Sequence, residues 1–238
     1  MDFSNRTVLV TGASRGIGLA IVEAFLKAGA KVIGVSTGEK PSSERYTHIS
    51  ANLAEAGAPA AIVAQLPKGF ESIDILVNNA GIKVNTEFTG STVEDWDATL
   101  NINLRAAYFL AQALNPQLAK SGDGRIINIS SQSGLAHVRT SIEYGVSKAG
   151  LSYITKSLAK ALAPQHITVN AVSPGRTHSD MTGYEGQPEK LQKALEKIPL
   201  HSINTPQEVA SLVVFLASGA AHNITGQIIG IDGGEANF

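Results

Sequence analysis

Residues 7–28 read TVLVTGASRGIGLAIVEAFLKA, and this stretch decides the fold. The apolar run at residues 7–10 has the length of a short buried strand. From Leu19 onward apolar residues recur at helical spacing, and Gly29 ends the helix that they predict. The stretch therefore predicts a strand, a tight turn and a helix in direct succession.

The turn is the glycine loop, TGASRGIG at residues 11–18. Glycine lets the backbone turn sharply and lets a ligand come close, and the start of a helix offers free N–H groups and a positive dipole end. A pyrophosphate group suits both features. The spacing of Gly12, Gly16 and Gly18 differs from the general dinucleotide pattern Gly-x-Gly-x-x-Gly. A turn without a ligand is the alternative, and the strand and helix on either side favour nucleotide binding.

The composition fits one α/β domain and excludes several classes of function. The chain has 238 residues with 19 basic and 20 acidic side chains, so its net charge of −1 gives no electrostatic case for nucleic acid or an anionic membrane. The absence of cysteine excludes disulfides, thiolate nucleophiles and cysteine-ligated metals, and the six histidines lack a metal-binding spacing. Because the N-terminus has no signal-peptide pattern and no apolar run reaches membrane length, we expect a cytoplasmic protein without a metal.

Segments typical of strands alternate with segments typical of helices along the chain. After the first strand, further strands are expected at residues 31–35, 46–50, 73–77, 125–129, 167–171 and 227–231. Further helices are expected at residues 58–66, 96–119 and 142–163, and after a capping box at residues 205–208. This order predicts a single doubly wound Rossmann-type domain, residues 1–238, with a parallel sheet of about seven strands and helices on both faces.

Four short segments follow predicted strands, namely the glycine loop and residues 78–81, 130–131 and 174–175. In doubly wound sheets, ligands lie beyond the carboxyl ends of the strands. We therefore expect these segments to form one active-site rim, with a substrate loop at about residues 175–202.

With these elements in place, the chain resembles the short-chain dehydrogenase/reductase family over essentially its whole length. The matching motifs are the glycine loop, NNAG at residues 78–81, Asn103, Ser131, YGVSK at residues 144–148 and PG at residues 174–175. The resemblance is closest to the bacterial 3-oxoacyl-carrier-protein-reductase branch. It implies a seven-stranded sheet, NAD(H) or NADP(H), interconversion of alcohols and ketones, and commonly a tetramer.

Tyr144 and Lys148 lie one helical turn apart, so both side chains can face one ligand. A free tyrosine has a pKa of about 10, and a nearby ammonium group lowers it. Tyr144 is therefore expected to donate a proton to the carbonyl oxygen during reduction and to accept it during oxidation. The resemblance further implies that Lys148 binds the nicotinamide ribose, that Ser131 rather than Ser133 orients the carbonyl oxygen, and that Asn103 anchors a water. A half-buried tyrosine beside a solvated lysine is the alternative, which the glycine loop and Ser131 disfavour.

The cofactor-binding residues are expected in the glycine loop and at the other strand ends. They are Gly12, Ser14, Arg15, Gly16, Ile17, Gly18, Ser36, Thr37, Asn52, Leu53, Asn79, Ala80, Gly81, Tyr144, Lys148, Pro174 and Gly175. NADP(H) is expected over NAD(H), because Ser36 stands where NAD-preferring enzymes of this fold place an acid. Arg15 can pair with the 2′-phosphate. Glu39 complicates this expectation, since a fold-back would return an acid to the ribose, and Lys40 would partly cancel its charge.

Three classes of function compete, and the motifs favour an oxidoreductase acting on a small ketone or secondary alcohol. A non-catalytic dinucleotide sensor usually loses the tyrosine or the lysine, and a cofactor-free lyase of this fold replaces the lysine and loses the glycine loop. A 3-oxoacyl-thioester reductase stays open as an alternative. A carrier-protein substrate is disfavoured, because residues 120–123 and 163–166 offer one lysine, offset by an aspartate, where a basic patch is needed.

The substrate pocket and the assembly are the least determined parts. Pocket walls are expected from residues 83–84, 132–143 and 176–200, which include His137, Arg139 and His178. A homotetramer is expected. In this family, the helices that correspond to residues 96–119 and 142–163 pair across a subunit interface. The apolar tail at residues 228–231 is expected to join a second interface. Trp96 and Phe109 are expected to belong to a helix of the protein core rather than to a stacking platform for a ligand.

Overall fold

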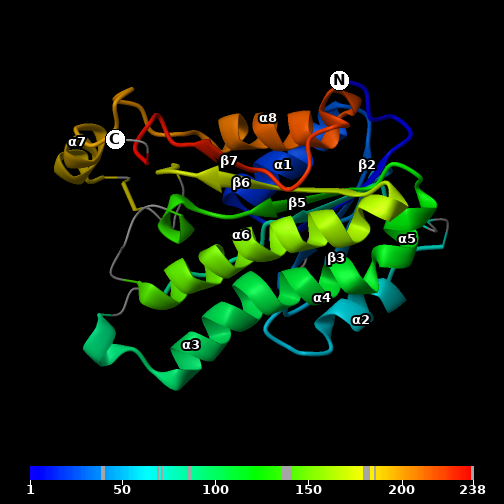
Figure 1. Ribbon diagram of the computed structural model, residues 1–238, viewed down its shortest axis with the longest axis horizontal. Helices are drawn as coiled ribbons and strands as arrows, with labels where there is room; N and C mark the ends of the chain where they lie inside the picture. The colour runs from blue at the N-terminus through cyan, green and yellow to red at the C-terminus, as the bar shows by residue number, and fades with distance from the viewer. Residues whose placement is uncertain are drawn as a thin grey trace.

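The computed structural model describes residues 1–38, 41–68, 70, 72–84, 87–135, 141–178, 183–184 and 186–236. Seven parallel strands form one sheet in the order β3-β2-β1-β4-β5-β6-β7 (Figure 1). They are β1 (Thr7–Thr11), β2 (Lys31–Ser36), β3 (Tyr46–Ser50), β4 (Ile75–Asn78), β5 (Arg125–Ile129), β6 (Thr168–Pro174) and β7 (Ile228–Ile231). The chain order reverses between β3 and β4, so the crevice that such sheets use for ligands lies at the carboxyl end of β1. The predicted fold class is confirmed.

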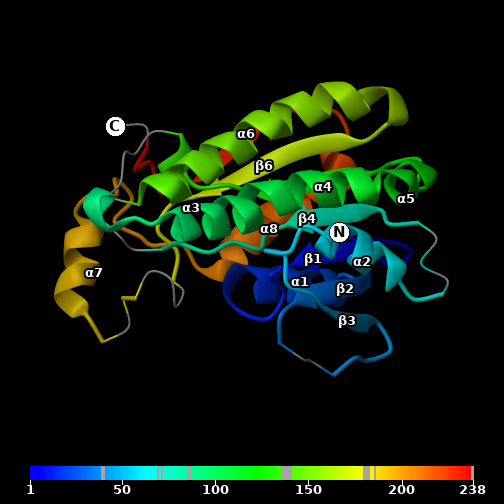
Figure 2. The same ribbon diagram turned by 90° about the horizontal axis from the view of Figure 1, so that it is seen from below.

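Helices cover both faces of the sheet (Figures 1 and 2). One face carries α1 (Gly16–Lys27) and α8 (Pro206–Ala217). The other carries α2 (Ala58–Ala64), α4 (Ala106–Ala113), α5 (Asn115–Lys120) and α6 (Ile142–Leu162). Two more helices, α3 (Val93–Leu100) before α4 and α7 (Pro188–Leu195) after β6, lie toward the carboxyl ends of the strands. None of the helices in the described ranges combines the length and the apolar character that a bilayer crossing requires.

The central strand explains how both faces are filled. Val8 and Val10 of β1 pack in the cluster with α1 and α8, and Leu9 between them packs in the cluster on the opposite face. All three side chains are fully buried. Because alternate residues of a strand point to opposite faces, a strand covered on both sides needs an uninterrupted apolar run, as this one has.

The single helix predicted at residues 96–119 is wrong in detail. It begins at Val93, because Thr92 and Asp95 form a capping box that the sequence reasoning missed. A π-helical turn at Asn101–Arg105 then separates α3 from α4, and α5 follows as a further helix. The expectation that Trp96 and Phe109 belong to the core is also wrong, since Trp96 is 39% and Phe109 45% exposed.

Candidate active site

The carboxyl ends of β1 and β4 are tied together by side-chain bonds. Asn79 follows β4, and its Nδ2 donates to the carbonyl oxygens of Thr11 at 2.8 Å and Gly12 at 3.2 Å. The backbone N–H groups of Asn79 and Ala80 both donate to Thr11 Oγ1 at 3.0 Å. The predicted neighbourhood of the glycine loop and the segment at residues 79–81 is therefore present, and each holds the other in place.

The glycine loop has the shape that a pyrophosphate needs. A Cβ on Gly18 would lie 2.0 Å from the carbonyl oxygen of Gly12, so α1 can begin this close to the loop only without a side chain there. Gly16, with a φ of 54°, faces open space, because a Cβ on it would meet no atom within 4 Å. An open approach to the N-terminus of a 12-residue helix is a suitable anion site, so these residues fit a dinucleotide.

The end of β2 lies directly beside the glycine loop. The N–H groups of Gly12 and Ala13 donate to the carbonyl oxygen of Val35 at 2.8 and 3.2 Å. The next residue, Ser36, is 9% exposed, and its Oγ lies 2.9 Å from Nε2 of His48 on β3. Exposed Thr37 completes this corner, and Arg15 at the N-cap of α1 is also exposed.

The segment after β3 lies at the same edge. Asn52 Oδ1 accepts from the N–H of Ala54 at 3.1 Å, which fixes the turn into α2. Leu53 is buried and borders a cavity of about 10 Å³, together with Thr11 and Ala80. The expected cofactor residues after β1, β3 and β4 thus enclose one region.

Lys148 is the most unusual residue of the site. It is 3% exposed, and its Nζ donates to the carbonyl oxygen of Ile129 at 2.7 Å. Nζ lies 5.7 Å from the centre of the Tyr144 ring, so the helical spacing brings the two side chains together. Because burial disfavours the charged amine, the pKa of Lys148 falls from 10.5 to about 8. Within the described ranges no carboxylate forms an ion pair with it.

Asn103 lies in the π-helical turn, which directs it toward the loop after β4. Its Nδ2 donates to the Ile82 carbonyl at 2.9 Å and to Ser147 Oγ at 3.0 Å, and its Oδ1 accepts from the Ile82 N–H at 2.8 Å. A Cβ on Gly81 would lie 3.4 Å from both Asn103 Oδ1 and Lys148 Nζ. Asn103 therefore borders the same space as the lysine.

Ser131 caps the 3₁₀ turn η3 (Gln132–Gly134). Its Oγ accepts from the backbone N–H of Ser133 at 3.2 Å. The turn packs closely on α6, because a Cβ on Gly134 would lie 2.5 Å from the backbone nitrogen of Ala149. This packing places Ser131 at the end of β5, alongside the helix that carries Tyr144 and Lys148.

Pro174 ends β6, and Gly175 opens the segment expected to contact substrate. A Cβ on Gly175 would lie 2.6 Å from that of Asp232, so the C-terminal turn closes over this position. The next residue, Arg176, joins two parts of the chain: its Nε donates to Glu235 at 3.0 Å and its Nη1 to the Tyr184 hydroxyl at 2.9 Å. The sequence reasoning missed this link, because it joins residues 59 positions apart.

Several expected residues lie outside the described part of the chain, namely Glu39, Lys40, His137 and Arg139. His178 is described, and its ring makes an edge contact with Tyr184, with centroids 6.5 Å apart. The remaining predicted catalytic and cofactor residues come together at one edge of the sheet.

Comparisons with known proteins cover nearly the whole chain. A family model described as enoyl-(acyl carrier protein) reductase matches residues 12–235. The 3-oxoacyl-[acyl-carrier-protein] reductase FabG of Aquifex aeolicus is 39% identical, with 98% of each chain covered. The protein of the same name from Rickettsia felis is 41% identical, again with 98% of each chain covered.

Solved structures agree with the chain in fold and differ in their cofactor. A putative NAD(P) dependent gluconate 5-dehydrogenase from Beutenbergia cavernae with bound NADP has a TM-score of 0.93 at 29% identity, covering 100% of this chain and 99% of that one. A 4-hydroxyisoleucine dehydrogenase complexed with NADH has a TM-score of 0.93 at 28% identity, covering 98% and 100%.

Proposed function

Because the chain belongs to the short-chain dehydrogenase/reductase family, we propose that it interconverts a ketone and a secondary alcohol with NADP(H) as the preferred cofactor. Membership itself makes it an NAD(P)-dependent oxidoreductase. The observation that carries the proposal is the pairing of Tyr144 with a buried Lys148 at the edge that bears the glycine loop. The nicotinamide cofactor, when bound, supplies or accepts the hydride.

Tyr144 is the proposed general acid and base. Its hydroxyl donates a proton to the carbonyl oxygen in reduction, and its phenolate accepts that proton in oxidation. Lys148, with a pKa of about 8, is mostly an ammonium group at neutral pH and lies 5.7 Å from the tyrosine ring. A positive charge at this distance favours the phenolate and so lowers the pH at which Tyr144 can act as a base.

Ser131 and Asn103 are proposed to support this proton transfer. Ser131 Oγ accepts from Ser133, which leaves its own hydrogen to donate to the substrate oxygen. Asn103 Oδ1 accepts one bond from Ile82 and keeps a second lone pair beside the space that Lys148 borders. We propose that a water held there connects Lys148 with solvent.

The preference for NADP(H) rests on the corner at the end of β2. Ser36 and Thr37 put hydroxyl groups where an acid would repel a 2′-phosphate, and Arg15 offers a planar guanidinium group nearby. The solved relatives bind NADP in one case and NADH in another, so they support the cofactor class and leave the preference to these residues.

The test is a panel of ketones and alcohols, followed by cofactor absorbance with each of the two nicotinamide cofactors. We expect a higher kcat/KM with NADP(H), and Arg15→Ala should lower that value about 10- to 100-fold, as loss of a charge-assisted bond to phosphate does. Values with NAD(H) should change little. Exposed Lys27 at the other end of α1 provides the matched control, Lys27→Ala. Wild-type preference for NAD(H), or equal weakening of both cofactors by Arg15→Ala, would contradict the proposal.

A second candidate function is the reduction of 3-oxoacyl groups on a carrier protein, because the FabG relatives carry that name at 39% and 41% identity. The charge of two possible docking places argues against the carrier, because residues 120–123 and 163–166 offer one lysine where a basic patch is needed. Comparing a 3-oxoacyl carrier protein with the same acyl group on a small thiol separates the two functions. Faster, salt-sensitive turnover of the carrier-bound substrate would favour the second candidate.

We propose a homotetramer as the assembly. The outer faces of α4 and α6 expose Tyr108, Phe109 and Tyr153, and a hollow of about 500 Å³ lies between these helices. Aromatic side chains exposed to this degree on neighbouring helices suit an isologous contact between two copies. Light scattering at micromolar concentration tests the assembly, and a monomer would contradict it.

A further inference from the structure

Ser36 has a neighbour that the sequence reasoning left without a role. In the parallel pair of β2 and β3, Gly34 stands opposite His48 and Ser36 stands opposite Ser50. Residues two apart on a strand share a face, so Gly34, Ser36 and His48 lie on the same side of this pair. Ser36 Oγ and His48 Nε2 are 2.9 Å apart.

The packing of this face brings the imidazole to Ser36. Gly34 has no side chain, and Tyr46 lies over it, since a Cβ on Gly34 would be 2.3 Å from the tyrosine hydroxyl and 2.9 Å from Ala13 Cβ. Tyr46 therefore fills the space below the glycine loop. His48 lies two residues after Tyr46 on the same face of β3. Its ring is therefore closer than that of Tyr46 to the end of β2, where Ser36 lies.

The direction of this hydrogen bond decides what Ser36 can offer a cofactor. A hydroxyl has one hydrogen and two lone pairs. If Nε2 accepts, the serine hydrogen is used and only lone pairs face the ligand, which suits a ribose hydroxyl. If Nε2 carries a hydrogen and donates, the serine O–H is free to donate to an anion. A 2′-phosphate oxygen only accepts, so it requires the second arrangement.

We propose that His48 is a specificity-determining positioning residue, which donates to Ser36 Oγ so that the serine hydroxyl donates to the 2′-phosphate of NADP(H). This inference rests on the proposed function and adds a residue to it. In this role His48 acts through Ser36 and serves the phosphorylated cofactor.

The test compares three variants by their KM for NADPH and for NADH. His48→Leu removes the donor, and we expect KM for NADPH to rise about five- to tenfold, the usual effect of one hydrogen bond, with kcat and KM for NADH unchanged. His48→Gln retains an N–H donor of similar reach, and KM for NADPH should stay within about twofold of wild type. Ser36→Ala should raise KM for NADPH about as much as His48→Leu.

The double variant tests whether the two residues act as one unit. If His48 works through Ser36, the combination of His48→Leu and Ser36→Ala should raise KM for NADPH no further than Ser36→Ala alone. Exposed His222, in the connection between α8 and β7, provides the control: His222→Leu should leave both KM values unchanged.

Two separate numbers report on the proposed cofactor and on this inference. The wild-type ratio of kcat/KM for NADPH over NADH tests the proposed preference. The change of that ratio in His48→Leu tests the role of His48. A KM for NADPH that does not move in His48→Leu, or an equal rise for both cofactors, would overturn the inference even where wild type prefers NADPH. Failure of His48→Gln to restore the wild-type value would overturn it as well.

Discussion

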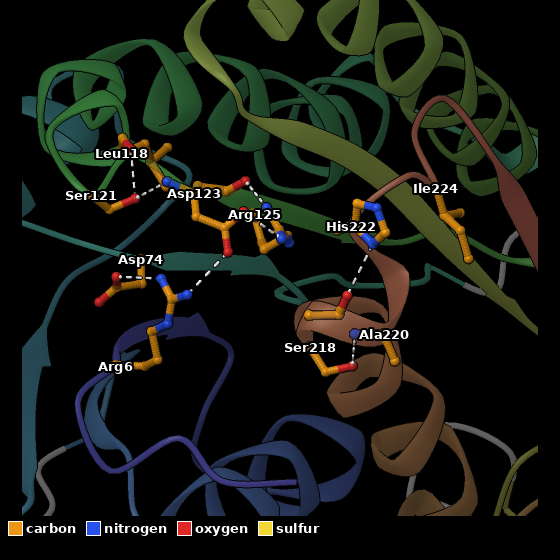
Figure 3. A network of polar contacts seen from close by, with 12 residues as sticks. Arg6, Asp74, Leu118, Ser121, Asp123, Arg125, Ser218, Ala220, His222 and Ile224 are labelled. Atoms are coloured by element: carbon orange, nitrogen blue, oxygen red, sulfur yellow. Dashed lines mark hydrogen bonds and ion pairs between the residues drawn. The ribbon is translucent and has the colours of Figure 1, made fainter.

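The parallel strands begin at one edge of the sheet, here called the amino edge, and end at the opposite one, the carboxyl edge. These two edges hold their charged side chains in opposite ways. At the amino edge, arginines and aspartates alternate in a chain of ion pairs (Figure 3). At the carboxyl edge, Lys148 is as buried as Arg125, and within the described ranges it has a backbone carbonyl as a partner and no carboxylate. With the proposed function, the same sheet carries one edge arranged for stability and one arranged for chemistry.

The charged side chains of the amino edge form ion pairs with each other. Arg6 bonds Asp74 at 2.9 Å and Asp123 at 3.0 Å, and Asp123 also pairs with Arg125 at 2.6 Å. Burial opposes the charge of Arg6, yet the bonds to both aspartates leave its pKa raised. Arg125 is 2% exposed and still keeps a carboxylate partner. Breaking such a pair leaves a buried charge uncompensated, which destabilises a fold.

At the carboxyl edge, the role that we propose for Lys148 requires an ammonium group without a carboxylate partner. A carboxylate beside Lys148 would neutralise the field that the lysine exerts on Tyr144. Lys148 instead has its pKa lowered to about 8 by burial. With the proposed function, the difference between the edges means that the site is built at some expense of stability.

Tyr144→Phe should produce the largest effect, a loss of activity at the carboxyl edge. Loss of the general acid should lower kcat about 100- to 10,000-fold on a verified substrate. The fold and the affinity for cofactor should be retained, because the phenyl ring fills the same space. Circular dichroism and cofactor titration check this, and a variant that keeps most of its activity would refute the assigned chemistry.

Asp74→Ala should have the next largest effect, on stability alone. The substitution removes the acceptor of Arg6 and of the Thr7 N–H, which is bonded at 2.7 Å, so the free energy of unfolding should fall by about 2–3 kcal/mol. Activity per folded molecule should not change, since the amino edge is remote from the site. Urea denaturation measures the loss, with exposed Glu23→Ala on α1 as the control. Lost turnover in folded Asp74→Ala would contradict the division between the edges.

Lys148→Arg should have a smaller effect on stability. It tests whether the carboxyl edge tolerates a buried charge that cannot be released. Arginine stays charged at every accessible pH, so it cannot relieve burial by releasing a proton. The stem of the lysine is also closely packed, because a Cβ on Gly134 would lie 2.9 Å from Lys148 Cβ. We expect a loss of about 1–2 kcal/mol in the free energy of unfolding, measured by urea denaturation. Unchanged stability would mean that the site has room and solvent for a permanent charge.

Much of the fold could be predicted because short runs of neighbouring residues determine each strand and helix. The strands at residues 46–50 and 125–129 have the predicted bounds, and the capping box at Thr205 begins α8 as expected. Each depends on a short run of apolar or capping residues. The glycine loop was equally readable, since its turn requires glycine within the loop itself.

What could not be predicted depends on contacts between distant residues. The π-helical turn contains no glycine or proline to mark it, and Asn103 holds it through bonds to Ile82 and Ser147. Helix α7 is an exception, because it was missed although Pro188 in its first turn and apolar residues at helical spacing mark it locally. The contact of His48 with Ser36 follows from the register of two strands, which no single segment reveals.

The free energy of unfolding of wild type and of Lys148→Met between pH 7 and 10.5 tests the central claim most directly. Unfolded wild type holds the lysine proton up to about pH 10.5, while the folded state releases it near pH 8. The buried charge therefore destabilises the folded state fully below about pH 8, and this destabilisation decreases as the pH rises toward 10.5. We predict that Lys148→Met is more stable than wild type by about 1–3 kcal/mol at pH 7, and that this difference shrinks above pH 8. A variant no more stable than wild type at pH 7, or a difference independent of pH, would contradict the account.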